Sequence, residues 1–122
     1  MSVWNRRVTA TSDGLHLQVD EDTPNPNPQG RNDTANSITV KATDRPGLIN
    51  YRADGVTLTG IAMKDGSQVP AALQVQVNGN GQLLQLTDTG GSGTDYSYYV
   101  VGDYGSNTGI QTEDPQIHNV QT

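Results

Sequence analysis

Short runs of alternating apolar and polar residues fill this chain, and glycine, asparagine, aspartate or proline separates one run from the next. Alternation is the pattern of a β-strand with one buried face, because successive side chains of a strand point to opposite sides. No segment of about 11 residues keeps its apolar residues at helical spacing. The pattern therefore predicts an all-β protein.

The runs recur about every ten residues, and this spacing is typical of a β-sandwich. We expect about seven to nine strands in an antiparallel, immunoglobulin-like β-sandwich. The clearest hairpin signal is the turn Asn78-Gly79-Asn80-Gly81, since both residue types accept a positive φ. The segments with strand character are 3–11, 15–19, 37–43, 48–53, 56–63, 71–77, 82–88, 95–103 and 116–120.

A single sandwich domain, residues 1–122, accounts for the whole length. Hydrophobic residues make up only 32% of the chain and phenylalanine is absent, so the core must be aliphatic, with Trp4 and five tyrosines as its rings. Because the apolar residues follow a period of two, we expect a thin ordered sandwich. Residues 20–36 interrupt the strands with three alternate prolines, and this composition predicts an exposed Pro/Asn-rich loop.

Charge narrows the range of partners. Thirteen acidic side chains against seven basic ones give a net charge of −6, which repels phosphate backbones and anionic lipid surfaces. Nucleic acid and membranes are therefore not expected partners. Residues 1–7 have no apolar core segment, so they do not make a signal peptide. The expected location is cytoplasmic as encoded, and extracellular if a leader was removed.

Enzymatic function is not expected. Nucleophilic catalysis needs a Ser, Thr or Cys beside a base that a third group orients, and the only histidines are His16 and His118. His118 alternates with Ile117 in a strand, so it should face solvent. Cysteine is absent, and two isolated histidines do not make a zinc site. We expect no catalytic residue and no resident cofactor.

Calcium is the alternative among ligands, because carboxylates and glycine gather in the turns. Asp88 and Asp95 bracket the glycine-rich segment 89–94 and are the candidate metal ligands. Asp, Asn and Gly also form turns for conformational reasons alone, and this second interpretation is favoured. The tyrosines could stack on sugar rings, but core filling is the favoured role in a chain without phenylalanine.

Several segments resemble a known family. The tyrosine-rich strand Asp95-Tyr96-Ser97-Tyr98-Tyr99-Val100-Val101 is followed by a glycine-containing loop and then by Asp114-Pro115-Gln116-Ile117-His118-Asn119. Together with Val3-Trp4-Asn5 and Val8-Thr9-Ala10-Thr11, these residues are similar to the DP-EP proteins, which are short bacterial proteins of unknown function. The resemblance implies a β-sandwich with a structural or assembly role, and it implies no catalytic residue.

The sequence favours a non-enzymatic sandwich that acts through protein–protein contacts, including contacts with copies of itself. An open sandwich has edge strands, and a neighbour can add a strand to such an edge. Residues 56–63 and 116–120 are the candidate edges, and Tyr96, Tyr98 and Ile117 are the candidate interaction residues. The alternative is a small carbohydrate- or calcium-binding module that uses loop carboxylates and exposed tyrosines.

Overall fold

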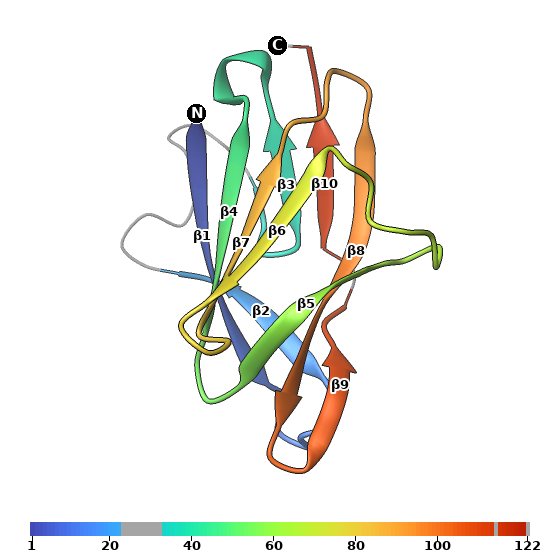
Figure 1. Cartoon of the computed structure of the whole chain (residues 1–122). Helices are drawn as coiled ribbons and strands as arrows, with labels where there is room; N and C mark the ends of the chain where they lie inside the picture. Colours follow the sequence, from blue (N-terminus) through green and yellow to red (C-terminus); the bar gives the residue numbers. More distant parts are fainter. Residues whose placement is uncertain (23–32, 114, 122) are drawn as a thin grey trace.

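A computed structural model of the chain describes residues 1–22, 33–113 and 115–121 (Figure 1). The described residues form a β-sandwich-like arrangement of two sheets, and none of their helices has the length and apolar character to cross a bilayer. In order, the first sheet contains β2 (Leu17–Glu21), β1 (Ser2–Ala10), β4 (Gly47–Ala53), β7 (Leu83–Asp88) and β6 (Leu73–Asn78). The second contains β3 (Ser37–Val40), β10 (Gln116–Asn119), β8 (Asp95–Tyr104) and β5 (Thr57–Met63), with β9 (Asn107–Gln111) paired to β8. A short 3₁₀ turn, η1 (Ala42–Asp44), precedes β4.

Both sheets are mixed, so the prediction of a purely antiparallel sandwich is wrong. β1 runs parallel to β4, with Trp4 opposite Ile49, and β10 runs parallel to β3, with Ile117 opposite Ile38. Alternation shows which face of a strand is buried, but it carries no information on the direction of the neighbouring strand. Parallel neighbours need a long connection, and here intervening strands supply it in both cases.

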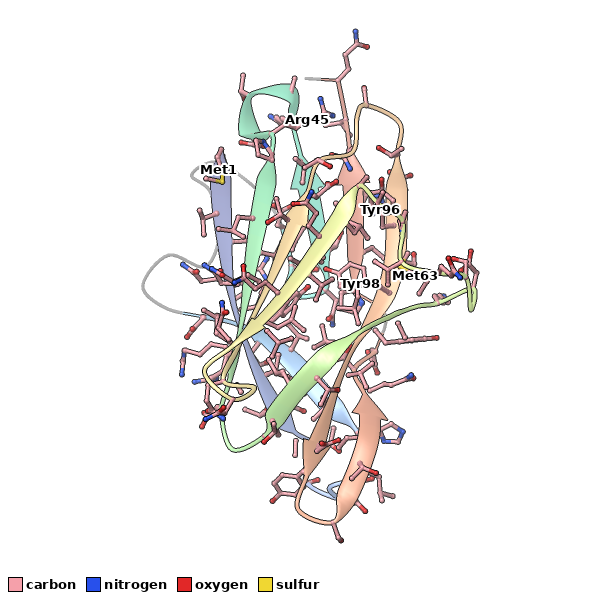
Figure 2. All side chains as sticks on the ribbon, in the orientation of Figure 1. Met1, Arg45, Met63, Tyr96 and Tyr98 are labelled. Carbon is pink, nitrogen blue, oxygen red and sulfur yellow. The ribbon has the colours of Figure 1, made fainter. Side chains whose placement is uncertain are left out.

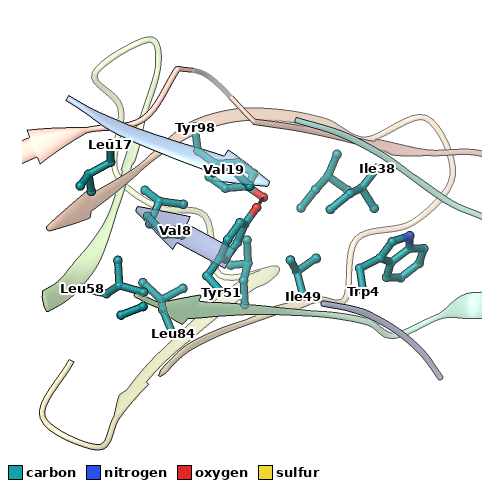
Figure 3. Packing of buried hydrophobic residues seen from close by; sticks show 14 of the residues in the cluster. Trp4, Val8, Leu17, Val19, Ile38, Ile49, Tyr51, Leu58, Leu84 and Tyr98 are labelled. Atoms are coloured by element: carbon teal, nitrogen blue, oxygen red, sulfur yellow. Dashed lines mark hydrogen bonds between the residues drawn. The ribbon is translucent and has the colours of Figure 1, made fainter. Parts of the chain in front are cut away.

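The core lies between the inner faces of the two sheets (Figure 3). The hydroxyl groups of Tyr51 on β4 and Tyr98 on β8 lie 2.5 Å apart and join one sheet to the other. Aliphatic side chains surround this pair, as the composition predicts. The buried hydrophobic residues are Trp4, Val8, Leu17, Val19, Ile38, Val40, Ile49, Tyr51, Ala53, Val56, Leu58, Leu73, Leu84, Leu86, Tyr98, Val100 and Ile117.

The predicted turn between β6 and β7 is confirmed. Gly79, Asn80 and Gly81 all adopt positive φ, at 62°, 57° and 86°. Gly81 also lies against the start of β5, where its carbonyl accepts a hydrogen bond from the Leu58 N–H at 2.8 Å. A side chain at this position would collide with Thr57, so glycine is required here for both backbone conformation and space.

Most of the predicted exposed loop 20–36, residues 23–32, lies outside the described part of the chain. Its described flanks, 20–22 and 33–36, include both exposed residues, Glu21 and Thr34, and a buried one, Asp22. On the first flank, β2 extends into the segment, and Asp22 is buried against an arginine of β4. On the second flank, a carboxylate oxygen of Asp33 accepts a hydrogen bond from the Trp4 indole at 2.9 Å. Composition indicated solvent exposure, but these carboxylates pair with specific donors on the sheets.

The expected edge at residues 116–120 is also wrong, because β10 lies between β3 and β8. The other expected edge, residues 56–63, corresponds to β5, which ends the strand order of the second sheet. The alternation of residues 116–120 carries no information on how many neighbours the strand has, and here β3 pairs with the side of β10 that β8 leaves open.

We expect the stability effects of replacing Tyr51 and Tyr98 to depend strongly on each other, because their hydroxyl groups share one hydrogen bond. Tyr98→Phe leaves the Tyr51 hydroxyl buried without its partner, and it should lower the free energy of unfolding by about 1–3 kcal/mol. Tyr51→Phe should behave in the same way. The double variant Tyr51→Phe/Tyr98→Phe leaves neither hydroxyl behind, so it should cost less than the sum of the single changes. Urea unfolding of the wild type, the two single variants and the double variant measures these free energies. If the loss in the double variant equalled the sum of the two single losses, the prediction would be contradicted.

Candidate functional site

The three candidate interaction residues occupy different environments. Tyr98 and Ile117 have no exposed surface, and both belong to the core. They present nothing to a partner while the fold is intact. Tyr96 is half-buried near the start of β8, where it lines a cavity of about 600 Å³ together with Met63 and residues of the segment 64–70 (Figure 2). Of the three, Tyr96 alone reaches a surface depression.

The two candidate metal ligands, Asp88 and Asp95, lie in different environments. Asp88 is buried at the end of β7, where its oxygens accept hydrogen bonds from the Gly90 N–H at 2.8 Å and from Asn119 Nδ2 at 2.7 Å. Asp95 is exposed, and its Oδ1 lies 3.6 Å from His118 Nδ1. Burial raises the pKa of Asp88, and its two hydrogen bonds act against this shift. In the part of the chain that the structure describes, no cluster of three or more His, Asp or Glu side chains could hold a metal ion.

Asp88 is part of a polar contact that links the sheets at one end of the sandwich. Asn119 on β10 donates to Asp88 on β7 and also donates to the Thr94 carbonyl at 3.0 Å. Arg45 approaches the same strand end, with Nη2 2.5 Å from the Val120 carbonyl and Nε 3.4 Å from Asn119 Oδ1. These contacts connect the end of β10 to both layers, which indicates a structural role for Asp88.

The two histidines lie at the surface in different parts of the fold. His16 is exposed in the turn before β2, beside a cavity of about 510 Å³. His118 is half-exposed on the second sheet, where Asp95 is its neighbour on β8 and Thr39 its neighbour on β3. His118 does not line the cavity beside Asp95. The structure therefore does not bring the two histidines together.

The free edge of β6 is the feature that sequence reasoning missed. Among the described strands, β6 pairs with β7 alone, and four of its six residues, 74–77, are exposed. The Thr89 N–H donates to the Ala72 carbonyl, so Ala72 and Thr89 form a hydrogen-bonded pair next to the β6–β7 ladder. This pair shows which residues of β6 bond to β7, because hydrogen-bonded pairs alternate along antiparallel strands. Even-numbered residues of β6 bond to β7, so the N–H and C=O groups of Val75 and Val77 point away from the sheet.

An apolar groove runs beside this edge. β5 and β6 belong to different sheets and diverge from each other (Figure 1), and a cavity of about 430 Å³ lies where they separate. Each of its lining residues is glycine or has an apolar side chain. The lining residues are Gly60, Ile61, Val69, Pro70, Ala71, Leu73 and Val75. An extended segment added to β6 would place alternate side chains over this groove.

A row of side-chain amides crosses the outer face of the first sheet and ends at the same edge. Asn50 donates to Asn5, Gln85 donates to Asn50, Asn78 donates to Gln85, and Gln76 donates to Asn78, each at 3.1–3.2 Å. The row spans β1, β4, β7 and β6. Because each amide both donates and accepts, the terminal Gln76 presents its carbonyl oxygen and one further N–H at the edge.

One signal in the sequence could have identified this surface. Residues 66–87 contain no charged side chain, although charged residues make up 16% of the chain. β6 and all of β7 except its last residue, Asp88, come from this uncharged segment. The charges that natural edge strands use to prevent pairing are missing from β6.

Comparison with known proteins adds no assignment. No protein-family model matches the chain, and a search of curated proteins finds no significant match.

Asp88→Asn should change how stability depends on pH. Burial raises the pKa of Asp88, so the folded protein binds a proton at this carboxyl more tightly than the unfolded chain does. The stability that this tighter proton binding contributes is fully present below the ordinary aspartate pKa of about 3.9. It is lost as the pH rises through the raised pKa of Asp88. The free energy of unfolding of the wild type, minus that of Asp88→Asn, should therefore fall across this window in urea titrations. If this difference rose with pH, the pKa of Asp88 would not be raised in the folded protein.

Proposed function

We propose that this chain is a non-enzymatic β-sandwich that acts through contacts with other proteins, in a structural or self-assembling role. One observation carries the proposal: the edge of β6 presents the outward backbone groups of Val75 and Val77, carries no charge and borders an apolar groove. A partner segment can add to such an edge, where main-chain hydrogen bonds give affinity and the groove selects side chains. The net charge of −6 favours a protein partner over nucleic acid or an anionic membrane.

We also infer an immunoglobulin-like strand order. In that fold, strands B, E and D are neighbours in one sheet, and strands G, F and C are neighbours in the other. If β4, β5, β6, β7, β8 and β10 correspond to B, C, D, E, F and G, the orders β4-β7-β6 and β10-β8-β5 agree with this scheme. β3 would then be strand A beside G, and β1, β2 and β9 would be additions. The order supports a fold relationship, which does not by itself specify a function.

A small carbohydrate- or calcium-binding module is the second candidate. Its support is the cavity beside Tyr96, which Asp65 and Asp95 also line. An aromatic face next to carboxylates suits a sugar ring or a cation. A melting temperature that rises with calcium or with a sugar would favour this alternative, because a ligand that binds only the folded state stabilises it.

Val75→Pro should weaken partner binding without unfolding the protein. The Val75 N–H points away from β7, so proline at this position removes an outward donor and keeps the β6–β7 ladder. Immobilised wild-type protein should retain partner proteins from extracts of the cells that produce it, and Val75→Pro should retain about tenfold less.

Val75→Ala is the matched control, because it shortens the same side chain but keeps the N–H. It should retain the partners, and unfolding midpoints should show that both variants are folded. If Val75→Pro retained the same proteins as the wild type, the β6 edge would not be the binding surface.

A further inference from the structure

We propose that the partner at the β6 edge is β6 of a second copy of this chain, paired antiparallel about a two-fold axis at Gln76. This inference rests on the proposed function, because it names the partner for the same edge. The resulting interface is isologous: both copies contribute the same residues, and pairing uses up the edge of each. The product is a closed dimer in which the two first sheets form one continuous sheet.

The backbone of β6 is self-complementary in this register. With Gln76 opposite Gln76 of the second copy, Val75 of each chain lies opposite Val77 of the other. The outward N–H and C=O groups of these two residues then form four hydrogen bonds across the axis. The N–H of the next outward residue, Leu73, already donates to the Pro70 carbonyl within its own chain at 3.0 Å. Pairing centred on Gln76 therefore satisfies the free polar groups of both valines.

The side chains match in the same register. Val75 and Val77 are 37% and 38% exposed on the inner face, and each would cover the other across the axis beside the apolar groove. On the outer face, the two Gln76 side chains would be direct neighbours. Each already donates one N–H to Asn78, so the remaining N–H and the carbonyl oxygen can pair reciprocally with the other glutamine. The amide row of one copy would then continue into the amide row of the other, across the joined first sheets of the dimer.

Charge favours a second copy at this edge. Two identical chains of net charge −6 repel each other, so the surface at which they meet must be free of like charges. β6 contains none, and the uncharged segment extends over residues 66–87. A neutral edge on an acidic protein is matched better by another neutral edge than by a basic peptide, whose charges would find no counterpart on β6.

The other described edges carry features that prevent pairing. β2 contains Asp20 and Glu21, which would face like charges in a second copy. β5 has a bulge between Leu58 and Gly60, and β9 has a positive φ of 65° at Gly109, so neither is regularly extended. β3 has only four residues. Short strands, bulges and charges are known ways to protect a sheet edge, and β6 has none of them.

Charge complementation at Gln76 tests whether the two-fold axis of the dimer passes through this residue. In sedimentation velocity up to millimolar concentration, the wild type should reach twice its mass of 13.0 kDa. Gln76→Glu places two carboxylates opposite each other and Gln76→Lys places two ammonium groups there, so each variant alone should dimerise at least about tenfold more weakly at pH 7. An equimolar mixture of the two should recover the dimer, because only residue 76 faces its own copy.

Gln18→Glu is the control. It adds the same charge as Gln76→Glu at an exposed position of β2, on the opposite edge of the first sheet, and should leave the dimer intact. Equal unfolding midpoints will show that the variants are folded. A wild type that stays monomeric, a dimer that both Gln76 variants preserve, or a mixture that remains monomeric would overturn the self-pairing. If the wild type is monomeric but Val75→Pro still loses its bound proteins, self-pairing fails and the proposed function stands.

Discussion

The hydrogen bond between the hydroxyls of Tyr51 and Tyr98 fixes how the two sheets face each other. Without phenylalanine, the chain fills the centre of its core with tyrosine, and each buried hydroxyl then needs a partner. The rings meet edge to face, with centroids 6.5 Å apart and planes at 80°, so that both hydroxyls reach the same point. Burial raises the pKa of Tyr51 to about 12, which keeps the pair neutral. A sliding of one sheet over the other would leave two buried hydroxyls unsatisfied.

The same constraint recurs elsewhere in the sandwich, where other polar contacts join separate parts of the chain. Arg6 is buried, and its guanidinium donates to the carbonyls of Thr34 and Ala35, which precede the second sheet. At one end of the sandwich, Asn119 on the second sheet donates to the buried Asp88 of the first. With hydrophobic residues at 32%, the apolar core is small, and it leaves the relative position of the sheets weakly determined. Directional hydrogen bonds between layers supply the missing specificity, because each is costly to leave unmade.

Alternation predicted the strand segments other than β9, and the β6–β7 turn, because these properties are local. It could not predict which strands would be neighbours, since the partner of β1 is β4 and the intervening residues contain no sign of that choice. It also gave no way to decide which of the adjacent Tyr98 and Tyr99 is buried, because apolar residues occupy both faces of β8. Asp88 was predicted as a ligand for a similar reason: its partner Asn119 lies 31 residues away.

The proposed surface follows from what the remaining edges lack. A sandwich with several free edges can associate without limit if two complementary edges remain open on each copy. Here acidic residues, a bulge, a left-handed glycine or short length protects each of the other described edges. Pairing at β6 therefore uses up the one edge of the described strands that is regular, uncharged and longer than four residues, and the two-fold symmetry stops the assembly at two chains. An uncharged segment that would be an aggregation risk in an open arrangement becomes a limited contact when it can pair only with itself.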